Sequence, residues 1–231
     1  MSNSAVIEIP PALVRVRRII AFARELRHVV PAPRGTPFYG LDSQLPFGFE
    51  TLEPLSSRGI FRKYELVLMQ GAGLGGAARW LVDRLGCRIV AVEPDPTICI
   101  AAMTLSRRTG SEAVRYVAGQ QQALPLRSRW FTHVWRIGAP ELQEDWIESL
   151  RVVRPGGHFG LQSLPHQSDD LIPHLCDQLA RAGFEAIESE SDRAAPLPRT
   201  VQLARQRFGD RAIDAGAEPA AIWRLFARRP S

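Results

Sequence analysis

Residues 66–96, LVLMQGAGLGGAARWLVDRLGCRIVAVEPDP, decide which fold the chain adopts. The stretch passes from an apolar segment through a glycine-rich turn into an amphipathic segment, and it ends with a second apolar segment and an acid. Gly71, Gly73 and Gly76 fit the pattern G-x-G-x-x-G, and Glu93 follows Gly71 by twenty-two residues. This order predicts a strand, a tight turn, a helix and a second strand, which together form a βαβ unit.

The same turn predicts a ligand site. Glycines permit positive φ angles and let a ligand approach the backbone, and the first turn of a helix offers free N–H groups to negative charge. A carboxylate at the end of the second strand, such as Glu93, can accept hydrogen bonds from both hydroxyls of a ribose. The motif by itself fits a dinucleotide site, an adenosylmethionine site or a tight turn without any ligand.

The alternation of strands and helices continues to the end of the chain. It predicts an α/β fold with a doubly wound, Rossmann-like, mostly parallel sheet. The expected strands are 64–70, 88–93, 113–117, 130–137, 158–163, 184–190 and 221–228, and the expected helices between them are 75–85, 95–107, 144–153 and 169–182.

Composition limits the classes of function. The chain has 231 residues, 45% of them hydrophobic, and carries a net charge of +5. Every basic residue except Lys63 is an arginine, and the arginines are dispersed, so we expect no nucleic-acid partner. The apolar runs are too short for a membrane span and no signal peptide is evident, which predicts a cytoplasmic protein without a transmembrane segment. The three cysteines have no metal-ligand spacing, so no metal is expected.

The first 60 residues form a separate part of the predicted organisation. Residues 11–30 read as an amphipathic helix with a basic face. That face suits a membrane surface or an acidic partner, but a helix packed on the domain with its arginines in solvent is the preferred interpretation. Residues 31–60 are rich in Pro, Gly and aromatic residues and are expected to form a cap or lid. The main domain is then 61–231, with an insertion at about 191–220. This insertion suits either a cover over the ligand site or a homodimer contact.

Several motifs together resemble class I S-adenosylmethionine-dependent methyltransferases, of the small-molecule, methyltransferase type 11-like branch. The segment 66–96 resembles their first two motifs, and four later segments match in order and spacing between about residues 60 and 229. These segments are YVAGQQQALPL (116–126), WFTHVW (130–135), SLRVVRPGGHFGL (149–161) and the pair LARAGFEAIESE (179–190) and AIWRLFARRP (221–230).

The resemblance implies a seven-stranded sheet whose last strand is antiparallel, with S-adenosyl-L-methionine bound over the carboxyl ends of the strands and a methyl group transferred to a small-molecule acceptor. It also implies which residues bind the cofactor. These are Gly71, Ala72, Gly73, Glu93, Pro94, Gln120, Gln121 and Arg136.

Three acids that such enzymes usually carry are replaced here. Met69 stands for the first-motif acid, Gln120 for the third-motif acid and Thr132 for the acid of the fourth strand. Met69 is the most consequential change, since it cannot orient the glycine turn by hydrogen bonding. The replacements leave open a methyltransferase-like subunit that binds or scaffolds without catalysis.

Two histidines are candidates for a catalytic base, because an imidazole is poised near neutral pH. His166 follows the fifth strand on the ligand side of the predicted sheet, and His133 lies inside the fourth strand. A nicotinamide enzyme and a nucleic-acid methyltransferase remain as competing functions, motivated by the glycine motif and by the basic charge.

Overall fold

A single sheet organises the protein. The computed structural model describes residues 9–43, 48–58, 65–138, 146–163, 171–193, 202 and 221–231. In this part of the chain seven strands pair in the order β3-β2-β1-β4-β5-β7-β6, which confirms the predicted fold class. The strands are β1 Leu66–Gln70, β2 Arg88–Glu93, β3 Val114–Ala118, β4 Phe131–Ile137, β5 Val153–Ser163, β6 Glu185–Arg193 and β7 Ala221–Arg228.

The strand directions bring several carboxyl ends together. β1 lies between β2 and β4, and both pairings are parallel. β3 and β5 continue the parallel arrangement outward. β7 runs antiparallel to both of its neighbours, β5 and β6. The carboxyl ends of β1, β2 and β4 therefore share one edge of the sheet, where open α/β sheets bind their ligands.

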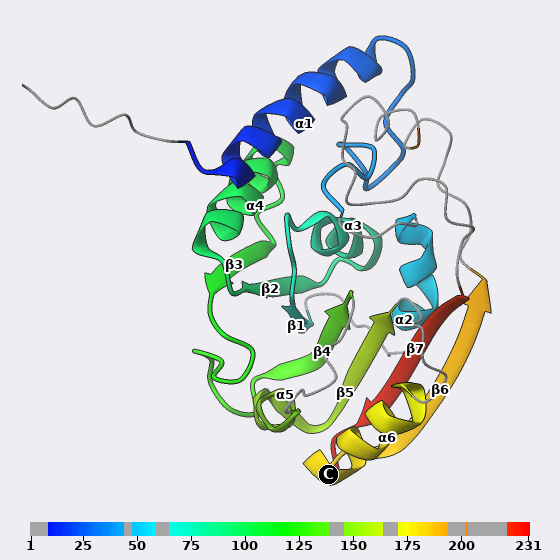
Figure 1. Ribbon diagram of the computed structural model, residues 1–231. Coiled ribbons are helices and arrows are strands. Elements are labelled where there is room, and N and C mark those ends of the chain that lie inside the picture. The colour runs from blue at the N-terminus through cyan, green and yellow to red at the C-terminus, as the bar shows by residue number, and fades with distance from the viewer. Residues whose placement is uncertain are drawn as a thin grey trace, which may run out of the picture.

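Helices cover both faces of the sheet (Figure 1). The 3-10 helix η1 and helices α2 and α3 contribute to a core on one face, and α5 and α6 to a core on the other. α1 packs outside α4 in a third apolar cluster. The helices are α1 Pro11–Arg27, η1 Phe49–Leu52, α2 Glu53–Arg58, α3 Gly76–Leu85, α4 Pro96–Thr109, α5 Ile147–Val152 and α6 Leu171–Ala182.

Local sequence explains where the helices next to the glycine turn begin and end. The carboxylate of Asp95 accepts a hydrogen bond from the backbone N–H of Thr97 at 2.7 Å and so caps α4, with Pro96 in the first turn. α3 and α4 both end at glycines in the left-handed region, Gly86 and Gly110, each with a φ of 67°. The predicted helix 95–107 is observed as Pro96–Thr109, with Asp95 as its cap.

Residues 9–43 and 48–58 pack on the α3 side of the sheet. The predicted helix 11–30 ends at Arg27, and the Tyr39 hydroxyl donates to the Val30 carbonyl at 2.6 Å, which holds the chain after the helix. Phe38, Tyr39 and Phe49 are buried, so these aromatic side chains pack against the fold. Among the described residues, no helix has the length and hydropathy needed to cross a bilayer.

The fifth strand differs from the prediction. It extends from Val153 instead of beginning at His158, so it includes the expected Arg-Pro-Gly-Gly turn. Val153 pairs with Phe131 of β4, and the register between the two strands shifts before His158. Gly156 has a φ of 69°, and its N–H donates to the Arg229 carbonyl at 3.1 Å. Neighbouring backbone on both sides thus pairs with this segment and draws it into the sheet.

Candidate active site at the glycine turn

The glycine turn lies at the carboxyl ends of β1 and β2. The backbone N–H groups of Gly71 and Ala72 both donate to the Val92 carbonyl, at 3.0 and 3.3 Å. Gly71 and Gly73 adopt φ angles of 66° and 52°, in the left-handed region that favours glycine. The turn therefore needs its glycines for backbone geometry, and it is anchored to the strand that ends in Glu93.

The Glu93 carboxylate faces this turn. Its Oε2 accepts a hydrogen bond from the Gly73 N–H at 2.9 Å, in a partly buried position. A charge-assisted bond of this kind is stronger than a neutral one. The structure thus brings Glu93 together with the glycines, as the sequence predicted, and directs the acid toward the edge of the sheet where a ribose would lie.

Gln120 and Gln121, which the resemblance assigns to cofactor binding, lie in the loop after β3. Gln121 reaches the turn, because a β-carbon built on Gly71 would be 3.6 Å from its Nε2 atom. Gln120 is exposed, and Pro94 is half-buried directly after Glu93. Of these predicted cofactor-binding residues, the structure therefore brings the Gln121 side chain to the glycine turn.

Two residues of α5 hold this loop in place, and sequence reasoning missed both. Oε2 of Glu148 accepts from the Leu124 N–H at 2.8 Å, and the Arg151 guanidinium donates to the carbonyls of Leu124 and Leu126 at 3.0 and 2.9 Å. Arg151 also donates to the Glu148 carboxylate at 2.5 and 2.7 Å. These bonds from Arg151 hold the pKa of Glu148 below its usual range. An acid and an arginine three residues apart on a helix were the available signal.

Met69, at the position of a missing acid, is part of the core. It is 1% exposed and belongs to the apolar cluster that includes Ala77 of α3 and Trp135 of β4. The turn is oriented instead by Glu93 at the Gly73 N–H and by the bonds to Val92. The turn therefore has other anchors although position 69 carries no acid, so Met69 is a less consequential change than the sequence suggested.

Thr132, at the position of another missing acid, forms a hydrogen bond within the sheet. Its hydroxyl donates to the Leu66 carbonyl at 2.9 Å near the beginning of β1. This is the edge opposite the glycine turn, so the change of Asp to Thr does not alter the candidate ligand edge.

Arg136 lies close to the carboxyl end of β4. It aligns with Gln70, the residue before the glycine turn, and it is 8% exposed. Its guanidinium carbon lies 5.4 Å from the centre of the Trp146 ring. Next to it the Ser149 hydroxyl donates to Oε1 of Gln70 at 3.0 Å. The α5 side of this edge is therefore polar, and it contains a buried cation.

The two candidate bases have different outcomes. His133 aligns with Val67 near the beginning of β1, and its Nδ1 lies 3.3 Å from the Glu65 carboxylate. Its ring stacks on His158 at 5.1 Å. Burial, with smaller contributions from the His158 and Arg154 charges, lowers its pKa to about 3. The structure therefore places His133 at the amino edge, apart from Gly71 and Glu93, and His166 lies outside the described residues.

Comparisons with known proteins agree with this geometry. A family model of a methyltransferase domain matches residues 68–161. The chain is 27% identical over 175 residues to the sterol 24-C-methyltransferase of Eremothecium gossypii, and the matched region covers 62% of this chain and 47% of that protein. It is 29% identical over 165 residues to the malonyl-[acyl-carrier protein] O-methyltransferase of Enterobacter lignolyticus, with coverages of 68% and 58%. The chain thus spans about half to three-fifths of the length of these relatives.

A solved structure supports the fold. Phosphoethanolamine N-methyltransferase 2 of Haemonchus contortus, solved in complex with S-adenosyl-L-methionine, superimposes with a TM-score of 0.62 at 17% identity, over 91% of this chain and 60% of that one. The family-model match, these relatives and the seven-stranded sheet together support a class I S-adenosylmethionine-dependent methyltransferase. The resemblance inferred from the sequence motifs is thereby confirmed.

Proposed function

We propose that the protein transfers a methyl group from S-adenosyl-L-methionine to a small-molecule acceptor. The observation that carries the proposal is the arrangement at the carboxyl ends of β1 and β2. There the Glu93 carboxylate and a turn with three left-handed glycines meet, joined through the Gly73 N–H. Relatives whose names describe methyl transfer to a sterol and to a carrier-bound malonyl group support the reaction type.

The residues present fit the cofactor. Glu93 supplies the carboxylate that would hold the ribose, and Gly71 leaves bare backbone where a β-carbon would come within 3.6 Å of Gln121. Met69 is packed in the core, so its side chain is directed away from the ligand edge. We assign Gly71, Ala72 and Gly73 to the methionine part and Gln120, Gln121 and Pro94 to the adenine side, with Glu93 at the ribose between them.

The chemistry requires little from the protein beyond alignment. The bound cofactor would supply an electrophilic methyl group, and the protein orients the acceptor and excludes water. Arg136, at the end of β4, is positioned to receive an anionic or polar part of an acceptor. His166 follows the carboxyl end of β5 in sequence, and it remains our candidate for the base that removes an acceptor proton. His133 is not part of this proposal, because it lies at the other edge of the sheet.

The organisation around the site is also part of the proposal. Residues 31–60 would act as a cap over the cofactor edge, and the insertion at about 191–220 would help to cover the acceptor or support a homodimer. Most of that insertion lies outside the described residues. A protein concentration series in analytical ultracentrifugation tests the dimer.

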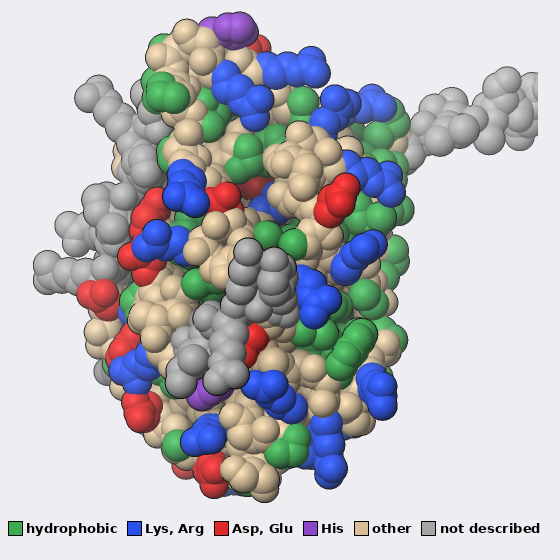
Figure 2. Space-filling model, turned by 180° about the vertical axis from the view of Figure 1, so that it is seen from behind, with side chains coloured by type: hydrophobic (Ala, Val, Ile, Leu, Met, Phe, Trp, Pro, Cys, Tyr) green, Lys and Arg blue, Asp and Glu red, His purple; other side chains and the backbone are tan. Residues whose placement is uncertain are grey.

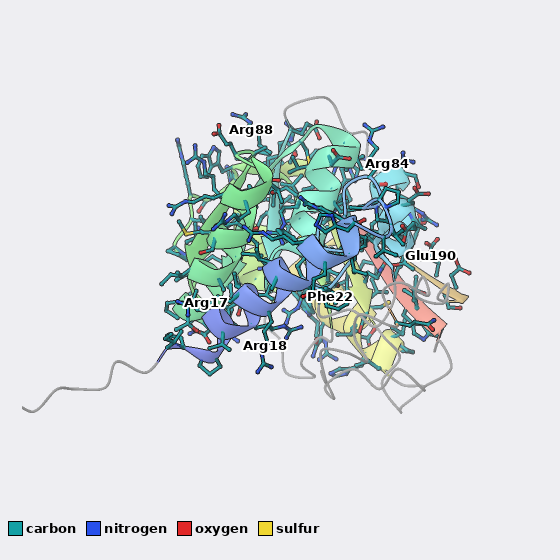
Figure 3. The ribbon with its side chains drawn as sticks, turned by 90° about the horizontal axis from the view of Figure 1, so that it is seen from above. Arg17, Arg18, Phe22, Arg84, Arg88 and Glu190 are labelled. Atoms are coloured by element: carbon teal, nitrogen blue, oxygen red, sulfur yellow. The ribbon has the colours of Figure 1, made fainter. Side chains whose placement is uncertain are left out.

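We propose that α1 is a packed helix with a solvated basic face. Val16, Ile19 and Phe22 are buried against the fold, while Arg17 and Arg18 lie exposed on its outer side (Figure 3). On the face seen in Figure 2, basic side chains are spread among acidic and apolar ones. Weak contact with an anionic membrane is the alternative role for residues 11–30. Cosedimentation with phosphatidylserine vesicles that Arg17→Gln abolishes would favour it.

Calorimetric titration with S-adenosylhomocysteine tests the proposed function. We expect wild-type protein to bind, and Glu93→Gln to raise the dissociation constant by roughly 10- to 100-fold, because charge-assisted bonds of about 1.5–3 kcal/mol each are weakened. Glu112→Gln is the matched control, since Glu112 is exposed before β3, at the opposite edge. A folded wild type that gives no heat at millimolar ligand would favour the scaffolding alternative.

The acceptor is the second unknown. We expect a radiolabelled methyl group to pass to a member of one of three pools offered separately: sterols and other prenyl lipids, carboxylic acids, and amines. A pool that accepts label only with wild type, and not with Glu93→Gln, identifies the class. Loss of labelling in His166→Ala, with unchanged cofactor affinity, would support the assigned base.

A further inference from the structure

One buried guanidinium joins the cap to the glycine turn. Arg79 lies in the first turns of α3 and is 3% exposed. Its Nη2 donates to Oδ2 of Asp42 at 2.6 Å and to the Leu74 carbonyl at 2.8 Å. Its Nη1 donates to the hydroxyls of Ser106 on α4 and Tyr116 on β3, each at 3.0 Å. Four segments that are distant in the sequence therefore meet at one charge.

The cap is in direct contact with the beginning of α3. The side chains of Asp42 and Arg79 are each 2% exposed, so their ion pair is shielded from solvent. A β-carbon on Gly76 would lie 2.9 Å from the Asp42 carboxyl carbon and 2.8 Å from the Phe49 ring. The Phe38 ring lies 5.7 Å from the Arg79 guanidinium carbon. Movement of the cap therefore requires either the ion pair or this packing to break.

The turn is held on both sides of the Gly73–Leu74 peptide bond. The Gly73 N–H donates to Glu93, and the Leu74 carbonyl, at the next residue, accepts from Arg79. A peptide plane fixed at its carbonyl also fixes the direction of the following N–H. The Gly75 N–H of the Leu74–Gly75 peptide donates to the Ala72 carbonyl at 2.9 Å, so loss of the Arg79 bond would leave this peptide with that bond alone, while Glu93 would still hold the Ala72–Gly73 peptide. One of the two bonds that orient the Leu74–Gly75 peptide of the turn thus comes from a guanidinium that Asp42 keeps in place.

We propose that Asp42 and Arg79 are a positioning pair, through which docking of residues 36–43 sets the glycine turn in its cofactor-binding geometry. The inference rests on the proposed function, since it specifies how the same site is organised. Both residues act through the Leu74 carbonyl, so neither is a catalytic residue. Because coupling between two sites is reciprocal, cofactor binding must stabilise the docked cap by the same factor.

The test compares a buried ion pair with an exposed ion pair, each of which has its arginine on α3. Asp42→Asn and Arg79→Lys perturb the positioning pair, and lysine cannot reproduce the planar fork of arginine. Glu53→Gln and Arg84→Lys are matched controls, because that ion pair joins α2 to α3 at 3.0 Å with both side chains at least half exposed. Leu179→Ala, at a buried core residue of α6, controls for a general loss of stability.

Two measurements are made on each variant at a temperature where all are folded. Calorimetry gives the affinity for S-adenosylhomocysteine, and we expect Arg79→Lys to weaken it roughly tenfold or more, with the controls unchanged. Hydrogen exchange without ligand should be faster in residues 71–76 for Asp42→Asn than for Glu53→Gln. In wild type the ligand should also slow exchange in residues 36–43, and Asp42→Asn should lose that protection.

The outcomes separate this inference from the proposed function. If wild type binds S-adenosylhomocysteine and Arg79→Lys binds it with equal affinity, the positioning role is overturned. It is also overturned if Leu179→Ala loses as much affinity as Arg79→Lys. If wild type binds no S-adenosylhomocysteine, the proposed function fails, and ligand-free exchange then decides the coupling. Faster exchange of residues 71–76 in Asp42→Asn alone supports it, and equal exchange in Asp42→Asn and Glu53→Gln overturns it.

Discussion

Replacing Gly75 by alanine should disturb the glycine turn far more than its backbone conformation alone predicts. Gly75 has a φ of 78°, and a β-carbon there would collide with the Tyr116 hydroxyl and lie 2.8 Å from the ζ carbon of that ring. Tyr116 cannot move without losing its bonds to Arg79 at 3.0 Å and Ser106 at 2.9 Å. Gly110, with a φ of 67°, provides the comparison, because a β-carbon there would meet nothing within 4 Å.

The expected magnitudes differ clearly. A non-glycine residue in the left-handed region costs about 1–2 kcal/mol, which is our prediction for Gly110→Ala. Gly75→Ala incurs the same cost and also breaks one bond to a charged group, worth about 1.5–3 kcal/mol, and one neutral bond, worth about 0.5–1.5 kcal/mol. We therefore expect Gly75→Ala to lower the free energy of unfolding by about 3–6 kcal/mol.

Urea unfolding followed by circular dichroism measures both variants. In a Tyr116→Phe background the two bonds are already lost, so Gly75→Ala should cost about 2–4.5 kcal/mol less there than in wild type. Burial raises the pKa of Tyr116 above its ordinary value, so its hydroxyl stays protonated across the assay range. If Gly75→Ala and Gly110→Ala are equally destabilising, the close contact between the turn and Tyr116 is refuted.

Three further predictions concern other parts of the fold. Because burial lowers the pKa of His133 to about 3, its contribution to the free energy of unfolding is complete above pH 6.5 and is lost as the pH falls toward 3. Lowering the pH from 7 to 5 should reduce the free energy of unfolding by about 2 kcal/mol. His133→Asn should flatten this pH dependence in urea titrations. Arg151→Met should weaken S-adenosylhomocysteine binding several-fold, because the Leu124 loop loses its anchor; unchanged calorimetric affinity would count against that anchor. Arg224→Met should lower the free energy of unfolding by about 2–4 kcal/mol, because it leaves the Gln162 amide oxygen and the Thr51 carbonyl without this buried donor; a midpoint equal to wild type would contradict this.

The sheet could be predicted because its signals are local. Apolar runs such as 88–93 and the glycine turn at 71–76 specify strand and turn within a few residues of sequence, and the predicted boundaries differ from the observed ones by one or two residues for most elements. The direction of the last strand followed from the resemblance to a family, since antiparallel pairing leaves no mark in the run AIWRLFAR itself. The bulged beginning of β5 was missed, because its pairing partners, Phe131 and Arg229, are distant in sequence.

The candidate site was predictable only where its residues belong to the motif. Gly71, Gly73 and Glu93 lie within one βαβ unit, and the structure brings them together. Arg79 and Asp42 are thirty-seven residues apart and meet through tertiary packing, which no periodicity records. His133 could have been assigned correctly, because a residue near the beginning of a parallel strand lies at the edge opposite the ligand.

The position of β7 between β5 and β6 has a consequence for biosynthesis. Because β7 follows both of its neighbours in the sequence, β5 and β6 emerge from the ribosome before the strand that separates them. Until residues 221–228 are released, a nascent chain presents two unsatisfied strand borders, and such borders invite pairing with other chains. Emergence of β7 should therefore be the moment at which this sheet stops depending on chaperones, and premature termination upstream of residue 221 should yield aggregates.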